Sequence, residues 1–97
     1  MKTYVILRRC GWRAADGLKE AVTQASAAVE QMPDDVRWIR SYVLSESDGS
    51  FGTVCIYEAT SPEAVRAHAE RASLPVDEIV ALAETLVVRP DPVETAA

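Results

Sequence analysis

Short apolar stretches typical of strands alternate along this chain with longer segments that have helical spacing. Apolar residues recur every three or four positions over 17–31, which predicts an amphipathic helix. A second helix is expected from Pro62 to about residue 72. The stretches rich in β-branched and aromatic residues predict strands over residues 2–9, 36–44, 51–58 and 83–89.

Residues with strong local preferences mark the ends of these elements. Asp16 stands where its carboxylate can cap the first helix, and Pro33 ends that helix. Ser61 is expected to cap the second helix, with Pro62 at the first helical position. The polar segment 46–50 predicts a hairpin connection between two strands.

The resulting order is β-α-β-β-α-β, which is that of the ferredoxin-like fold. This α+β sandwich carries both helices on one face of a four-stranded antiparallel sheet. A length of 97 residues leaves room for one domain, and we expect residues 1–89 to form it. Residues 90–97 contain two prolines and mostly small side chains, and they are expected to be a flexible C-terminal tail.

Strict alternation along the strands divides the predicted sheet into two faces. The aliphatic set is expected to lie under the helices and comprises Val5, Leu7, Ile39, Val43, Val54 and Ile56. The other set holds most of the aromatic residues and two arginines: Tyr4, Ile6, Arg8, Trp38, Arg40, Tyr42, Leu44, Phe51, Thr53, Cys55 and Tyr57. Burying one such ring stabilises by about 1.5–3 kcal/mol. We therefore expect a second copy to cover this open face, in a homodimer of the dimeric α/β barrel type.

Composition limits the partners and the compartment. A net charge of −5, from 15 acidic and 10 basic residues, argues against nucleic acid. No run approaches eighteen consecutive apolar residues and no signal peptide is evident, so we expect a cytoplasmic protein without a membrane span. Cys10, Cys55 and the single histidine, His68, cannot provide four zinc ligands within one chain. The two cysteines are expected to be thiols.

Two of these residues are candidates for chemistry at a metal or an electrophile. His68 lies on the inward stripe of the second helix, where it either packs at the core edge against a backbone carbonyl or acts as a ligand or proton carrier. Cys55 is either a small buried apolar residue or a thiolate. The thiolate would need a cation on the same face, which Arg8 or Arg40 could supply.

Two arginines and three aromatic residues are candidates for binding a small molecule. Arg8 and Arg40 either hold a carboxylate or an enolate or form salt bridges in an interface. Trp38, Tyr42 and Tyr57 either stack on a planar ligand or pack in that interface.

Three stretches resemble one known family. They are Arg37–Val43, Cys55–Ala59 and Pro62–Ala72. Together they resemble a group of small bacterial ferredoxin-like proteins of mostly unknown function that includes dimeric nickel-binding proteins, and the resemblance covers roughly residues 2–89. It implies a divalent transition metal such as nickel, with Cys55 and His68 as the matching positions that favour such ions. The nickel-binding branch carries histidines on its first strand and first helix, where this chain has residues such as Arg8 and Val22.

These observations lead to three functional hypotheses of different class. The first is a ligand- or metal-binding accessory protein whose site lies in a cavity of a ferredoxin-like dimer. The second, by analogy of fold, is a small cofactor-free oxygenase, cyclase or dehydratase in which Arg40 holds an enolate and Tyr42 or His68 moves protons. The third is a non-catalytic interaction domain without a cavity. The sequence does not decide whether the protein is an enzyme.

Overall fold

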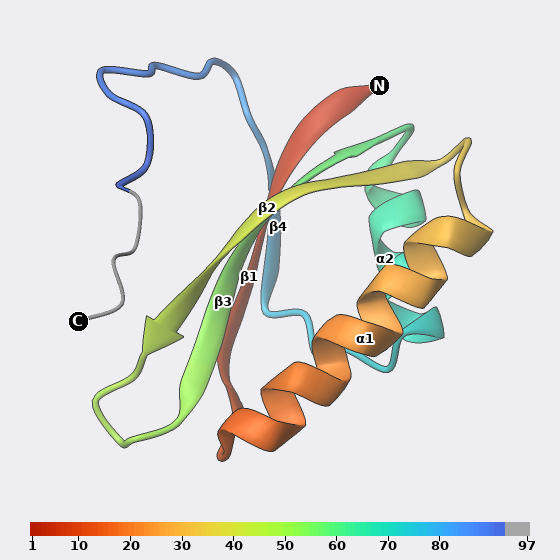
Figure 1. Cartoon of the computed structure of the whole chain (residues 1–97). Coiled ribbons are helices and arrows are strands. Elements are labelled where there is room, and N and C mark those ends of the chain that lie inside the picture. Colours follow the sequence, from red (N-terminus) through yellow and green to blue (C-terminus); the bar gives the residue numbers. More distant parts are fainter. Residues whose placement is uncertain (93–97) are drawn as a thin grey trace.

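The computed structural model describes residues 1–92 and has the predicted order of elements. These are β1 (Lys2–Trp12), α1 (Ala15–Gln31), β2 (Val36–Ser45), β3 (Phe51–Ala59), α2 (Pro62–Arg71) and β4 (Glu78–Ala81). The strands form one antiparallel sheet in the order β2-β3-β1-β4. Both helices lie on the same face of this sheet (Figure 1). The ferredoxin-like α+β fold is therefore confirmed. No helix among the described residues is long and apolar enough to cross a membrane.

The two helices begin in different ways. Ser61 caps α2 as predicted, because its Oγ accepts a hydrogen bond from the backbone N–H of Ala64 at 3.1 Å, and Pro62 is the first helical residue. The cap predicted for α1 is wrong. The N-cap residue is Ala14, which makes no side-chain capping bond. Asp16 lies in the first turn, where its negative charge interacts favourably with the helix dipole.

The last strand lies earlier than predicted. We expected it over 83–89, but β4 is Glu78–Ala81 and pairs with Tyr4–Leu7 of β1. The backbone N–H of Leu82 donates to the carbonyl of Thr3 at 2.9 Å, which brings the pairing to the beginning of β1. The β-branched residues that follow have no further length of β1 to pair with. Residues 82–92 instead form an extended segment on the side of the sheet away from the helices (Figure 1); we call this segment the C-terminal arm.

The helix-covered face of the sheet carries the aromatic residues, so the predicted assignment of faces is wrong. Tyr4, Ile6, Cys55 and Tyr57 are at most 5% exposed and pack in the core under the helices. The helices contribute mainly small side chains to this layer: Ala21, Ala25, Ala28, Ala69 and Ala72. Small residues on the helices leave the volume that large rings on the sheet require. The open face instead carries aliphatic residues, among them Val5, Leu7, Val54, Ile56 and Val80.

A bulge in β2 changes which side chains share a face. Trp38 lies opposite Tyr57, whereas Arg40 lies opposite Ile56, so Ile39 is an extra residue between two regular pairs. Trp38 therefore points to the helices, while Arg40 and Tyr42 point to the open face. The single domain over 1–89 and the flexible tail over 90–97 stay predictions, since residues 93–97 lie outside the described part of the chain.

Candidate ligand-binding site between sheet and helices

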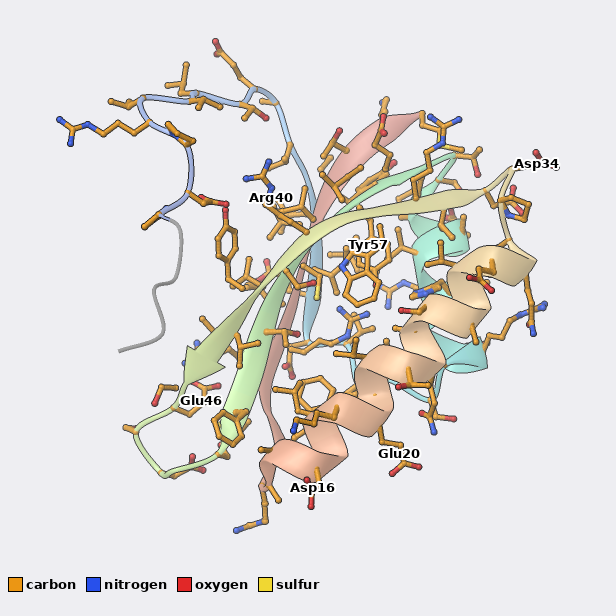
Figure 2. The ribbon with its side chains drawn as sticks, in the orientation of Figure 1. Asp16, Glu20, Asp34, Arg40, Glu46 and Tyr57 are labelled. Carbon is orange, nitrogen blue, oxygen red and sulfur yellow. The ribbon has the colours of Figure 1, made fainter. Side chains whose placement is uncertain are left out.

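Five of the seven predicted site residues meet in the layer between the sheet and the helices. These are Arg8, Trp38, Cys55, Tyr57 and His68. Arg40 and Tyr42 lie on the other side of the sheet, near the C-terminal arm. In Figure 2 the Tyr57 ring lies between the strands and α1, whereas Arg40 points away from the helices. The structure thus divides the predicted set into a buried group and a group on the open face.

Arg8 is the largest fully buried side chain, with 1% of its surface exposed. It projects from β1 opposite Thr53 of β3. Its Nε, Nη1 and Nη2 atoms have no hydrogen-bond partner within residues 1–92. A guanidinium carries five N–H donors and keeps its charge at any physiological pH. A buried charge left without a partner costs on the order of 3–5 kcal/mol. The presence of an arginine at this position therefore requires an explanation other than a contribution to the stability of the fold.

His68 also has one ring nitrogen without a partner. The side chain is 0% exposed, and Nε2 lies 3.0 Å from the carbonyl oxygen of Ala25 on α1. Because a carbonyl only accepts, Nε2 carries the proton and donates, which leaves Nδ1 as a buried acceptor. No described residue donates to Nδ1. Burial lowers the pKa of His68, an effect that the hydrogen bond to Ala25 opposes and the charge of Arg8 increases, so the ring is neutral at pH 7.

Tyr57 connects the other members of the buried group. Its ring stacks on Trp38 with centroids 6.0 Å apart and planes 9° apart, and it lies 5.1 Å from the ring of His68 at 55°. Burial raises the pKa of the Tyr57 hydroxyl, so it stays protonated. The indole Nε1 of Trp38 donates to Ser41 Oγ at 2.8 Å, which fixes the orientation of Trp38.

A small cavity adjoins these side chains. Its volume is about 30 Å³, and Arg8, Trp38, Cys55 and Tyr57 form its floor on the sheet. Seven further residues that were not predicted as site residues also line it: Trp12, Leu18, Ala21, Val22, Ala25, Thr53 and Leu74. Leu18 and Val22 belong to the helical stripe already expected to face the sheet, so the periodicity could have indicated them. A cavity of this volume holds about two water molecules, or a ligand of a few heavy atoms.

The residues around this cavity are poorly suited to a transition metal. Within residues 1–92 there is no group of three or more His, Cys, Asp or Glu side chains placed to hold an ion. Cys55 is a free, buried thiol with Sγ 3.4 Å from Thr53 Oγ1, and the nearby guanidinium would repel a cation. Nickel favours imidazole and thiolate ligands, and His68 and Cys55 provide only two. The nickel site expected from the resemblance does not fit this pocket.

The fold and the pocket define a small α+β protein of the ferredoxin-like type with a buried cationic group between sheet and helices. A sequence model of the family described as "Nickel responsive protein SCO4226-like" matches residues 4–82, and the chain belongs to this family. The family expected from the sequence is thereby confirmed.

One solved structure supports this fold, and a second matches a similar share of this chain but adds no support. SCO4226 from Streptomyces coelicolor A3(2) is similar with a TM-score of 0.69 and 24% sequence identity, over 87% of this chain and 99% of that chain. Rv0793 from Mycobacterium tuberculosis has a TM-score of 0.42 and 16% identity, over 92% of this chain and 100% of that chain. No curated protein matches the chain significantly.

Proposed function

We propose that this protein is an accessory binding protein that holds a small anion beside Arg8. The observation that carries this proposal is the guanidinium itself, which is 1% exposed and has three nitrogen atoms without partners among the described residues. An anion with two oxygens would accept a bidentate pair of hydrogen bonds and neutralise the charge. The favourable energy of that pair would be gained on binding, because residues 1–92 offer the guanidinium no acceptor.

The dimensions of the cavity favour a short ligand. About 30 Å³ suits an oxyanion of three or four heavy atoms, such as formate or acetate, and is too small for a cofactor. The rings of Trp38 and Tyr57 and the side chain of Leu18 line this volume, and apolar surroundings of this kind strengthen the attraction between an anion and Arg8. The proposed ligand is therefore a small carboxylate or a similar oxyanion.

An anion explains the buried group better than a metal does. A nickel ion would leave the charge of Arg8 unpaired, and of the two candidate ligands, Cys55 and His68, only Cys55 lines the pocket. The response to nickel in the family's description is a property of the family. The description of the family does not supply the metal ligands that are missing from this pocket.

A binding role also agrees better with the geometry than the enzymatic hypothesis does. That hypothesis placed Arg40, Tyr42 and His68 at one reaction centre. His68 lies beneath the helices, whereas Arg40 and Tyr42 lie on the open face and contact Asp91 of the C-terminal arm. The sheet separates the proposed enolate-binding group from the proposed proton carrier.

The proposal includes a cytoplasmic homodimer that forms through the open face of the sheet. That face presents aliphatic side chains to solvent, including Ile39 at 47% and Val80 at 44% exposure, and no described helix covers it. A second copy related by a two-fold axis would bury two equivalent faces. The sequence predicted this dimer from exposed aromatic rings. In the structure Tyr57 is buried and Trp38 packs under the helices, so Tyr42 and the exposed aliphatic side chains are what a second copy would cover.

Thermal denaturation and titration calorimetry with sodium acetate, sodium formate and neutral acetamide test the binding site. At constant ionic strength we expect the two anions to raise the melting temperature of the wild-type protein, and acetamide to leave it unchanged. Arg8→Met should abolish the effect of the anions, whereas Arg66→Met, which removes an exposed arginine of α2, should retain it. An equal response to acetamide and acetate, or a full response in Arg8→Met, would refute an anion site at Arg8.

A further inference from the structure

The C-terminal arm, residues 82–92, crosses the open face without covering it. It leaves the sheet after β4 and returns to β2, where Asp91 accepts a hydrogen bond from Arg40 Nη1 at 2.8 Å. The hydroxyl of Tyr42 donates to the same carboxylate at 3.0–3.1 Å. Between these attachments the arm stands away from the sheet (Figure 1). A groove of about 380 Å³ remains between the arm and the sheet, with Ile39, Ile56 and Glu58 on one side and Thr85 and Val87 on the other.

The middle of the arm consists of three consecutive apolar residues in water. Leu86 is 82% exposed, Val87 is 73% exposed and Val88 is 91% exposed. Single exposed apolar residues are common, but a run of three beside an exposed aliphatic face indicates an interaction surface. Burying a valine or leucine side chain stabilises by about 1.5–3 kcal/mol. The arm thus carries apolar side chains that could pack on the aliphatic open face and a carboxylate, Asp91, that binds Arg40 on that face. In the described structure the three apolar side chains remain exposed to solvent.

We propose that two copies of the chain exchange their C-terminal arms across the open faces. In this arrangement Leu86, Val87 and Val88 of each copy lie on the partner's sheet. Asp91 then binds the Arg40 and Tyr42 side chains of the other copy in place of its own. The inference rests on the proposed homodimer and adds a specific contact to it.

One observation favours a second copy over a different partner. The anchor is complementary within the chain itself: the carboxylate of Asp91 fits the pair formed by Arg40 and Tyr42, and exchanging identical elements preserves that contact.

Charge reversal at the anchor distinguishes an exchanged arm from one that stays on its own sheet. In a mixture of Arg40→Glu chains and Asp91→Arg chains, each chain alone sets like charges against each other. Only an exchanged heterodimer pairs opposite charges at both anchors. A second mixture contains the wild type and the double variant Arg40→Glu/Asp91→Arg, each of which has a matched anchor of its own. An exchanged heterodimer of that mixture sets like charges against each other at both anchors.

Native mass spectrometry of the two equimolar mixtures, with one chain of each isotopically labelled, provides the measurement. Random pairing gives heterodimer as about half of all dimers. At low ionic strength we expect an excess of heterodimer in the first mixture and a deficit of heterodimer in the second. Each should change the equilibrium constant for forming heterodimer from the two homodimers by roughly fivefold or more. Both deviations should decrease at high salt.

Two other results of these measurements would overturn different parts of the proposal. Dimers that pair at random in both mixtures would overturn the exchange of arms and leave the proposed homodimer intact. If every chain, the wild type included, were monomeric at micromolar concentration by light scattering, the homodimer would be overturned together with the exchange. The double variant keeps a matched anchor in either arrangement, so its far-UV circular dichroism shows whether these substitutions preserve the fold.

Discussion

The rings of Trp38 and Tyr57 lie almost parallel, 9° apart, with their centroids 6.0 Å apart. The two residues are directly opposite each other on β2 and β3, immediately before the bulge in β2. This pair fills the space between the sheet and the alanine-rich faces of the helices. It is also part of the wall of the cavity beside Arg8. The same stacking contact therefore supports the core and shapes the proposed binding site.

Replacing Tyr57 tests how much of the stability this contact provides. We expect Tyr57→Ala to lower the free energy of unfolding by about 3–5 kcal/mol, because it removes a ring that is 1% exposed and leaves a void under the helices. Tyr57→Phe keeps the ring and should cost less than about 1.5 kcal/mol. Urea denaturation followed by tryptophan fluorescence measures both. Similar losses in the two variants would show that the hydroxyl matters more than the stacking.

Removing the charge of Arg8 should stabilise the protein in the absence of a ligand. Arg8→Met replaces an unpaired, buried guanidinium with an apolar side chain of similar length. Such replacements of buried charge by apolar residues stabilise by about 1–4 kcal/mol. Urea denaturation in a buffer free of carboxylates measures the change, with the exposed Arg66→Met variant as control, for which we expect a change within about 0.5 kcal/mol. A destabilised Arg8→Met protein would indicate that the guanidinium already has a partner.

The order of the elements could be predicted from the sequence because it depends on local patterns. The capping serine at 61, the proline after it and the apolar spacing along 17–31 act within a few residues of chain. The last strand was misplaced because its position depends on where β1 begins, at Lys2, and not on the β-branched residues near Val87. Propensity describes a segment, whereas pairing requires a partner strand of sufficient length.

The two faces of the sheet could not be assigned from alternation alone. Alternation shows which residues share a face but not which face the helices cover, and here the size of the helix residues decides it. The extra residue at Ile39 also interrupts the alternation, so Trp38 and Arg40 lie on opposite faces although they are two positions apart. Five of the seven predicted site residues therefore lie together under the helices, whereas Arg40 and Tyr42 lie on the other side of the sheet.

The buried His68 should make the stability depend on pH. Burial lowers its pKa in the folded protein below the usual value of 6.5, so the unfolded chain takes up a proton at a higher pH than the folded one. The stability from keeping the ring neutral is fully present above pH 6.5 and decreases as the pH falls from 6.5 toward the lower pKa of the folded state. The slope is at most about 1.4 kcal/mol per pH unit.

Urea denaturation between pH 7.5 and about pH 5.5 measures this slope, above the range where most carboxylates titrate. In His68→Gln the slope should be absent, because glutamine does not take up a proton and can still donate to the carbonyl of Ala25. Arg8, Tyr57 and the Ala25 carbonyl face His68, and burial raises the pKa of Tyr57, so its hydroxyl stays neutral in this range. A slope that persists in His68→Gln would have to come from another group.

The contact between β1 and β3 near Arg8 depends on Gly52. A Cβ atom at this position would lie 2.5 Å from the backbone carbonyl oxygen of Arg8 and 2.7 Å from the carboxylate of Glu46. That carboxylate accepts hydrogen bonds from the Arg9 side chain and from the Cys10 backbone N–H, which lower the pKa of Glu46 to about 2. Gly52→Ala should therefore push β3 away from β1 and disturb the end of β1 that positions Arg8. We expect it to lower the free energy of unfolding by about 2–4 kcal/mol.

Gly17 offers a matched control for this substitution. A Cβ atom there would meet only the Trp12 side chain, at an ordinary contact distance of 3.7 Å, and the residue lies in the first turn of α1. Gly17→Ala should stabilise by up to about 1 kcal/mol, because alanine has less conformational freedom to lose on forming a helix. Urea denaturation of both variants gives the comparison. If Gly52→Ala were as stable as Gly17→Ala, the close approach of β3 to the Arg8 backbone could not be what holds this end of the site in place.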